Sequence, residues 1–333
     1  MKTKWISLQI LCISLCLSLS SQAKIWRVNN NAGVSADFTN LNTALASALV
    51  QSGDTIYLEA SATPYSGGTL NKKLVIIGAG YFLSENTGLQ VSTEDSRLNS
   101  IIIDSLGSGS KFFGIRSNLV YCNSNADDIT FSRCHIGISS NNSFANSLMS
   151  NWVINKCYIG QFNFSSAAYT FQDLQITNCI ISSGFNLASS INGLIRNNLF
   201  LNSVTINNCY VANNIFSTAF NPSFVNCTVK YNISTANNLP AGNNNQVNVP
   251  QASLFVLTGS TDGRYQHAAG SPAIGAGEPI GGVTPDCGPF GTADPYRLSG
   301  IPPIPTIYQL LVPSSVPASS TSMTVTVSTR SNN

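Results

Sequence analysis

The residues of this sequence that could support acid–base chemistry gather between Asp127 and His135. Asp127 and Asp128 are adjacent, and Arg133 and His135 follow within a few positions. Two carboxyl groups on one face can hydrolyse a glycosidic bond, one as acid and the other as base or nucleophile. Neighbouring residues on an extended strand point to opposite faces, so Asp127 and Asp128 would lie on different faces if this segment were a strand. The four residues are therefore weak catalytic candidates, and a polar turn is the simpler interpretation.

A six-residue pattern begins within this region and recurs along the middle of the chain. Each copy has apolar residues at both ends and Cys or Asn in the fourth place: FSRCHI from 131, INKCYI from 154, ITNCII from 176, IRNNLF from 195, INNCYV from 206, VANNIF from 211 and FVNCTV from 224. The first four copies start 23, 22 and 19 residues apart, which is typical of one solenoid turn. Later copies interleave in two registers, and the sequence leaves open which register continues the ladder.

This spacing predicts an all-β fold, a right-handed parallel β-helix whose short strands stack about 4.8 Å apart. The two apolar ends of a copy can both face inward only if the chain bends between them, and Asn adopts the left-handed conformation of such a bend more readily than most residues. We expect a stacked structural ladder formed by Cys134, Cys157, Cys179, Asn198, Cys209, Asn214 and Cys227. The opposing interpretation is an Asn-rich β-sandwich with accidental similarity between its strands.

The residue after each ladder position is often aromatic or branched. The set comprises His135, Tyr158, Ile180, Leu199, Tyr210, Ile215 and Thr228. If these residues stack on one outer face, Tyr158 and Tyr210 could form a platform for sugar rings, and they are weak ligand-binding candidates. Ordinary lateral packing between coils would use the same residue types. His267 is interpreted as a turn residue, and the spacing of acids, Cys and His predicts no metal site.

The two ends of the repeat region differ from it in pattern. Residues 37–53 place Phe38, Leu41, Leu45 and Leu49 at helical spacing, which predicts a short amphipathic helix that caps the first coil. Residues 24–300 are assigned to the β-helix domain. Residues 301–333 contain two strand candidates and are assigned to a C-terminal appendage or cap.

Residues 1–23 have the pattern of a secretory signal peptide: Lys2 and Lys4, then an apolar run, then small residues before the expected cleavage site. We expect a secreted or cell-surface protein, with the periplasm as an alternative, and no membrane-spanning segment after cleavage. The remaining chain has 14 basic and 14 acidic side chains, so it lacks the excess of positive charge that nucleic acid or an anionic membrane would attract. We expect a monomer.

Seven cysteines remain after residue 23, an odd number with regular spacing. Parallel side chains in adjacent coils disfavour the torsion of a disulfide. We therefore expect mostly free, buried thiols. The exceptions to consider are a bond between Cys122 and Cys134, or one to Cys287.

Three segments together resemble the secreted β-helix proteins of the pectin-lyase-like superfamily, in the form common in Bacteroidetes. They are the block GVSADFTNLNTALASALVQSGDTIYLEA with KKLVIIGAGY, the IxNNxI-type repeats, and GSPAIGAG with DCGPFGTADPY, spanning about residues 33–300. The resemblance implies the fold but no single activity, because the superfamily includes lyases, hydrolases, adhesins and proteins of unknown role.

A lyase of that superfamily would need several carboxylates to hold Ca²⁺, and Asp173 is the only acid between Ile129 and Thr261. The GH and RIK elements of its hydrolases are also absent from this sequence. The sequence therefore favours an exported structural or binding protein without a cofactor, which contacts polysaccharide or a cell-surface protein. The alternative is a polysaccharide lyase, which would use Ca²⁺, or a glycoside hydrolase acting on a pectin-like substrate.

Overall fold

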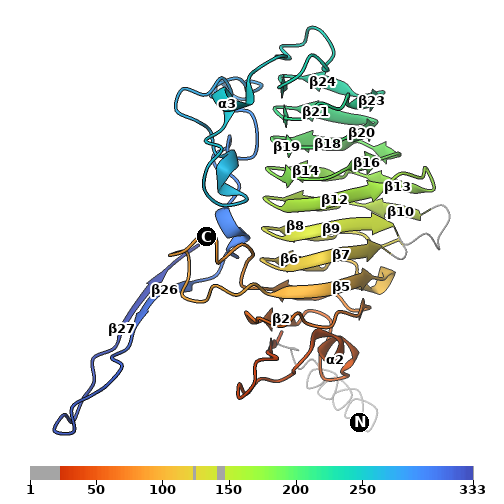
Figure 1. Cartoon of the computed structure of the whole chain (residues 1–333). Coiled ribbons are helices and arrows are strands. Elements are labelled where there is room, and N and C mark those ends of the chain that lie inside the picture. The colour runs from red at the N-terminus through yellow and green to blue at the C-terminus, as the bar shows by residue number, and fades with distance from the viewer. Residues whose placement is uncertain (1–22, 123–124, 141–146, 333) are drawn as a thin grey trace, which may run out of the picture.

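The chain forms a parallel β-solenoid of about nine turns in a computed structural model that describes residues 23–122, 125–140 and 147–332. Figure 1 shows the strands stacked one above another along a single axis, with the N-terminal coils at one end and β24 near the other. The expected signal peptide lies outside the described residues, except for Ala23 at its end.

Three parallel sheets line the sides of the solenoid. The first sheet stacks, in order, β1 (Ile25–Val28), β2 (Thr55–Leu58), β4 (Val75–Ile77), β6 (Lys111–Phe113), β8 (Thr130–Ser132), β11 (Val153–Asn155), β14 (Gln175–Thr177), β18 (Gly193–Arg196), β21 (Cys209–Ala212) and β24 (Thr228–Lys230). The second sheet stacks β3 (Thr69–Leu70), β5 (Arg97–Ile103), β7 (Arg116–Cys122), β9 (His135–Ser140), β12 (Tyr158–Phe164), β15 (Ile180–Ile181), β19 (Leu199–Phe200), β22 (Ile215–Phe216) and β25 (Ile233–Ser234), with a branch from β12 through β16 (Phe185–Leu187), β20 (Val204–Asn207) and β23 (Ser223–Val225). The third sheet contains β10 (Ser147–Ser150), β13 (Tyr169–Gln172) and β17 (Ser190–Ile191).

Each copy of the six-residue pattern is a corner of the solenoid. The third residue of every copy has a left-handed backbone conformation, with φ between 53° and 58°. Five copies, from 131, 154, 176, 195 and 211, form a first corner, where the chain leaves the first sheet for the second. The copies from 206 and 224 form a second corner, where the chain enters the first sheet. The segment 206–216 therefore bends twice, at Asn208 and at Asn213, with β21 between the bends.

Two separate hydrogen-bonded ladders follow these corners. At the first corner, the backbone N–H of Cys134 donates to Cys157 Sγ at 3.4 Å, that of Cys179 to Asn198 Oδ1 at 2.9 Å, and that of Asn198 to Asn214 Oδ1 at 2.9 Å. Asn232 extends this ladder because its Oδ1 accepts from the Asn214 N–H at 2.9 Å. At the second corner, the N–H of Cys209 donates to Cys227 Sγ at 3.5 Å. The side chains of the seven ladder residues thus belong to two stacks, where the sequence predicted one.

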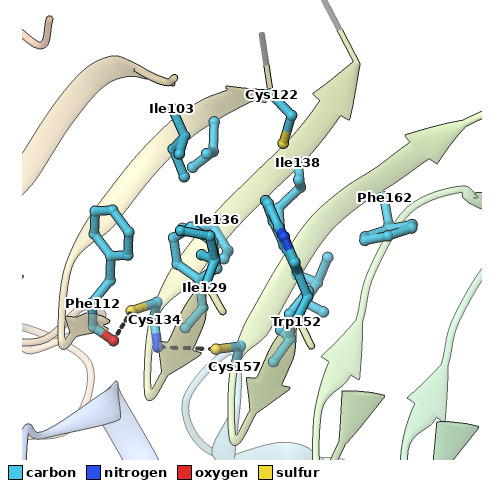
Figure 2. Packing of buried hydrophobic residues seen from close by; sticks show 14 of the residues in the cluster. Ile103, Phe112, Cys122, Ile129, Cys134, Ile136, Ile138, Trp152, Cys157 and Phe162 are labelled. Carbon is cyan, nitrogen blue, oxygen red and sulfur yellow. Dashed lines mark hydrogen bonds between the residues drawn. The ribbon is translucent and has the colours of Figure 1, made fainter. Parts of the chain in front are cut away.

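The interior is filled by stacked apolar side chains from all three sheets. Figure 2 shows this packing around Cys134, whose Sγ contacts the carbonyl oxygen of Phe112 at 3.5 Å. The rings of Phe112 and Phe131 stack at 4.5 Å between centroids, one coil above the other. All seven cysteines from Cys122 to Cys287 are free thiols, and Cys227 alone among them is partly exposed. The expected free thiols are present, and the suggested bonds of Cys122 with Cys134 or to Cys287 are wrong.

A short helix, α2 (Leu41–Ala46), lies at the N-terminal end of the solenoid, where Figure 1 places it below β2. Leu41 and Leu45 are buried against the first coil, as expected of a cap. The helix is shorter than the predicted pattern, because the backbone becomes extended at Ser47. Leu49, which the pattern placed on the apolar side of the helix, is therefore outside it and is 68% exposed.

Residues 247–301, which we call the strap, leave the last coil and run back along the outside of the first corner (Figure 1). The strap contains α3 (Gln251–Leu254) and the 3₁₀ turns η2 (Gly263–Tyr265) and η3 (Leu298–Gly300). A further 3₁₀ turn, η1 (Ser105–Gly107), lies between β5 and β6. Leu254, Phe255, Ala273 and Cys287 of the strap form one apolar cluster with outward-facing residues of the coils. The strap therefore covers this side of the solenoid.

The chain ends in an antiparallel ribbon of β26 (Thr306–Leu311) and β27 (Thr326–Arg330), which projects away from the coils (Figure 1). The first strand lies within the candidate segment 301–312, and the second overlaps the candidate Thr324–Ser328 but ends two residues later. Within the described ranges, no helix has the length and apolar character needed to cross a membrane.

Candidate functional site

The two adjacent acids of the first candidate cluster hold the second corner of their coil. Asp127 Oδ1 accepts a hydrogen bond from the backbone N–H of Ser150 at 2.7 Å. Asp128 is the left-handed residue of the corner, and its Oδ1 accepts from Asn151 Nδ2 at 3.0 Å. Both carboxylates therefore bind the next coil, in the manner of corner residues.

Arg133 and His135 lie at the opposite end of β8, at the first corner. The His135 ring lies between Phe82 and Tyr158, with 4.9 Å between ring centroids in each case, and is largely covered by them. Burial, with a further contribution from the charge of Arg116, lowers the pKa of His135 to about 3, so the ring is neutral at physiological pH. The structure thus separates the two acids from these two residues and brings no common site together.

The expected platform of seven residues is divided between two sheets. His135, Tyr158, Ile180, Leu199 and Ile215 pair in register along the second sheet, and Ile233 continues their column. The strap covers this column, so Tyr158 is only 9% exposed. Tyr210 and Thr228 pair with each other on the first sheet instead. A single platform is therefore wrong, because the copies that supply these residues belong to different corners.

Tyr210 borders a surface hollow of about 700 Å³. We call it the Tyr210 hollow; its walls come from three successive coils and are formed by Ser190, Ile191, Asn192, Gly193, Leu194, Asn208, Cys209, Tyr210, Asn226 and Thr228. Tyr210 stands between Leu194 of the preceding coil and Thr228 of the following coil. The volume lies within the range of about 300–1,000 Å³ that is usual for small-ligand sites.

Three exposed asparagines are stacked in this hollow, one from each coil. Asn192, Asn208 and Asn226 are the left-handed residues of the second corner in consecutive coils. Among the described residues, none hydrogen-bonds to the side-chain amides of these three, whereas Asn198 and Asn214 of the first corner use theirs in the ladder. With coils about 4.8 Å apart, the three amides span roughly 10 Å. They present both donors and acceptors to solvent.

A charged cluster lies beside the ring of Tyr210 on the same sheet. Arg196, Ala212 and Lys230 occupy one column in three successive coils, and the small Ala212 leaves room between the two cations. Glu278 of the strap enters there: its Oε1 lies 2.6 Å from Lys230 Nζ, and its Oε2 lies 3.2 Å from Arg196 Nη2. The Tyr210 hydroxyl donates to the same Oε2 at 2.5 Å. Glu278 thus joins the strap to the edge of the hollow.

The environment keeps this cluster in its ordinary charge state. Burial opposes ionisation of Glu278, but the hydrogen bonds from Lys230 and Tyr210 outweigh it, and the pKa of Glu278 is lowered. The hydrogen bond to Glu278 raises the pKa of Lys230. Burial, followed by the hydrogen bond to Glu278, raises the pKa of Tyr210. At neutral pH Glu278 is therefore ionised and Lys230 is protonated.

Sequence reasoning missed Glu278 and the exposed asparagine column. Glu278 lies in a Gly/Pro-rich segment about 48 residues after Lys230, and no local pattern places it there. The left-handed asparagines at 192, 208 and 226 follow the spacing of the coils, so a separate alignment of the second corner could have identified them.

Comparison with protein-family models and with curated proteins gave no match for this chain. In the part of the chain that the structure describes, no three or more His, Cys, Asp or Glu side chains gather as metal ligands would.

Proposed function

We propose that this protein is an exported β-solenoid that binds polysaccharide at the Tyr210 hollow without cleaving it. The observation that carries the proposal is the column of three exposed amides, to which no described residue hydrogen-bonds, beside a partly exposed tyrosine ring. Sugar hydroxyls both donate and accept hydrogen bonds, and an amide can satisfy both roles. Aromatic rings offer an apolar face for the C–H side of a sugar, with a polar hydroxyl at the edge.

The solenoid supports this function by holding the contact groups at a fixed repeat. The asparagines lie on corners that are fixed by backbone hydrogen bonds, such as the one from the Asn208 N–H to Val225 O at 2.9 Å. A rigid, preformed surface loses little conformational entropy when a ligand binds. A polysaccharide whose sugar units repeat at a similar distance to the coils can therefore contact several coils at once.

Non-catalytic binding is favoured over lyase chemistry by the charge state of the cluster. Proton abstraction from a sugar requires an unprotonated base, and the pKa of Lys230 is raised rather than lowered. Glu278 already accepts hydrogen bonds from Lys230, Arg196 and Tyr210, so its oxygens hold the strap.

Binding can be tested on the protein starting at Lys24, with immobilised pectins, alginate and neutral plant and host glycans as probes. We expect at least one polysaccharide to bind, and Tyr210→Ala to weaken that binding about tenfold through loss of the ring contact. Asn208→Ala removes one amide and should weaken binding less. Tyr121→Ala is the matched control, because Tyr121 is a partly exposed tyrosine of β7 in an earlier coil.

Two results would contradict the proposal. One is equal retention of wild type and Tyr210→Ala on every polysaccharide, or no retention of either. The other is the appearance of new unsaturated or reducing ends during incubation, which would establish the lyase or hydrolase alternative.

Export is supported by the charged, apolar and small-residue order of residues 1–23. The measurement is the intact mass of the protein recovered outside the cytoplasm, with Lys24 expected as its first residue. Recovery of uncleaved chain from the cytoplasm would refute export.

A further inference from the structure

A second cavity of about 400 Å³ lies where the first corner, the strap and the base of the ribbon meet. Its walls are formed by Leu89, Arg133, Gln266, Phe290, Pro295, Tyr296, Arg297, Leu298, Ile301, Arg330, Ser331 and Asn332. The three arginines come from three different elements, and none of the lining residues is acidic. We call it the arginine cavity.

Arg133 is the most deeply buried of the three, with 5% of its surface exposed. Its Nη1 donates to the carbonyl oxygens of Ile301 at 3.0 Å and Asn332 at 2.7 Å. Within the described ranges, no carboxylate lies within ion-pair distance of Arg133. A buried cation without an anionic partner is costly, because carbonyl oxygens offset only part of the lost hydration.

Other coils have different side chains at the corner position of Arg133, and these side chains make different contacts with the strap. Lys156 is the equivalent corner residue one coil on, and it pairs with Asp294 of the strap. Asn178 and Asn197 follow it, and their neutral amides donate to strap carbonyl oxygens, Asn178 to Pro289 at 3.1 Å and Asn197 to Asp286 at 2.9 Å. Asn would also suit the left-handed backbone of Arg133 better. Neither the backbone nor the contact with the strap therefore requires arginine at 133.

The other two arginines leave the cavity positive. Arg297 is 46% exposed, and its nearest carboxylate oxygen, on Asp294, is 3.7 Å away and belongs to the residue that also pairs with Lys156. Arg330 donates through Nη2 to Leu89 O, and its buried Nε has no hydrogen-bond partner within the described part of the chain. Burial, followed by the charge of Arg297, lowers the pKa of Arg133, and the charge of Asp294 offsets this only in part.

We propose that the arginine cavity binds a small organic oxyanion, a carboxylate or sulfate group carried on a body of one or two rings. Planar guanidinium groups bind such oxyanions through paired hydrogen bonds, and the charge of the ligand would offset the three like charges. The apolar side chains of Leu89, Phe290 and Pro295 provide a wall for the body of the ligand. The site is distinct from the Tyr210 hollow, with which it shares no lining residue.

The test is isothermal titration of the protein from Lys24 with four probes: galacturonate, galactose 6-sulfate, inorganic sulfate and neutral galactose. We expect galacturonate or galactose 6-sulfate to bind and to weaken as salt is raised, inorganic sulfate to compete with them, and galactose not to bind. Preference between the first two probes identifies whether a carboxylate or a sulfate ester is the natural group.

Variants locate the binding. Arg133→Asn removes the buried charge while placing at the corner the residue that other coils use there, and we expect about tenfold weaker binding. Arg297→Gln changes a half-exposed residue and tests the site even if Arg133→Asn does not fold. Arg264→Gln, an exposed arginine elsewhere on the strap, is the matched control and should bind as wild type does.

The proposal is overturned if no oxyanion binds at millimolar concentration, if galactose binds as tightly as galacturonate, or if Arg297→Gln leaves binding unchanged. Tyr210→Ala should retain oxyanion binding, and Arg133→Asn should retain polysaccharide binding. Failure of one site is therefore distinguishable from failure of the other.

Discussion

His135 should make the stability of this protein fall between pH 6.5 and pH 5, well above the range in which most carboxylates titrate. Its ring is enclosed by Tyr81, Phe82 and Tyr158, its buried Nδ1 has no hydrogen-bond partner among the residues that the structure describes, and burial lowers its pKa to about 3. The charge of Arg116 disfavours protonation further.

The sign follows from the protons bound in each state. An unfolded chain has a histidine pKa of about 6.5, so below that pH the unfolded state binds a proton that the folded state excludes. Stability due to neutral His135 is therefore complete above pH 6.5 and is lost progressively as the pH falls toward 3. At about 1.4 kcal/mol per pH unit, the loss reaches about 2 kcal/mol at pH 5.

The measurement is urea unfolding, followed by intrinsic fluorescence, at pH 7 and pH 5. His135→Phe keeps an aromatic ring in the same column but cannot be protonated, so we expect it to remove about 2 kcal/mol of the difference between the two pH values. Tyr158→Phe is the matched control: it changes the neighbouring ring without a group that titrates in this range, and it should retain the wild-type pH dependence. Equal pH dependence in wild type and His135→Phe would refute the argument, since the protonated ring would then be tolerated in the folded state.

Three further predictions concern the ladder, the thiols and the strap. Asn214→Ala should destabilise the protein by about 2–4 kcal/mol in urea unfolding, because it leaves several buried ladder groups unpaired, whereas exposed Asn192→Ala should cost only about 1 kcal/mol, the penalty of alanine in a left-handed conformation. A thiol reagent should modify Cys227 first in the native protein, because the other six described thiols are buried and burial raises the pKa of Cys209 to about 12. It should reach the remaining thiols only after unfolding, and rapid native modification of all seven would contradict the buried ladder. Glu278→Gln removes the negative charge between Arg196 and Lys230 and should therefore speed proteolytic cleavage of the strap near residues 279–284. A cleavage rate equal to that of wild type would show that the apolar cluster alone holds the strap.

The repeat pattern was sufficient to predict the coils because the interactions that form them are local and periodic. Ile206, Val211 and Phe216 are fully buried, as the five-residue spacing with an intervening bend requires. The bend needs a left-handed residue, which Asn supplies at 208 and 213. A chain with this spacing buries these side chains by stacking its coils, so the pattern favoured the fold class that the structure has over the alternative β-sandwich.

The assignment of each copy to a corner could not be read from the same pattern. INNCYV and VANNIF have the same local geometry, and only the pairing of β20 with β23 and of β21 with β24 places them at different corners. For that reason the sequence grouped Tyr210 with Tyr158, although one borders an open hollow and the other lies under the strap.

By itself, then, the sequence determined the solenoid, its inward-facing residues and its bends, because each depends on neighbours within one coil or one repeat away. Only the tertiary structure decided which outward-facing residues remain accessible. The strap brings Glu278 to Tyr210 and encloses Arg133 through contacts between segments as far apart as Arg133 and Ile301. Such contacts have no period in the sequence, so the two candidate sites appear only when the whole chain is folded.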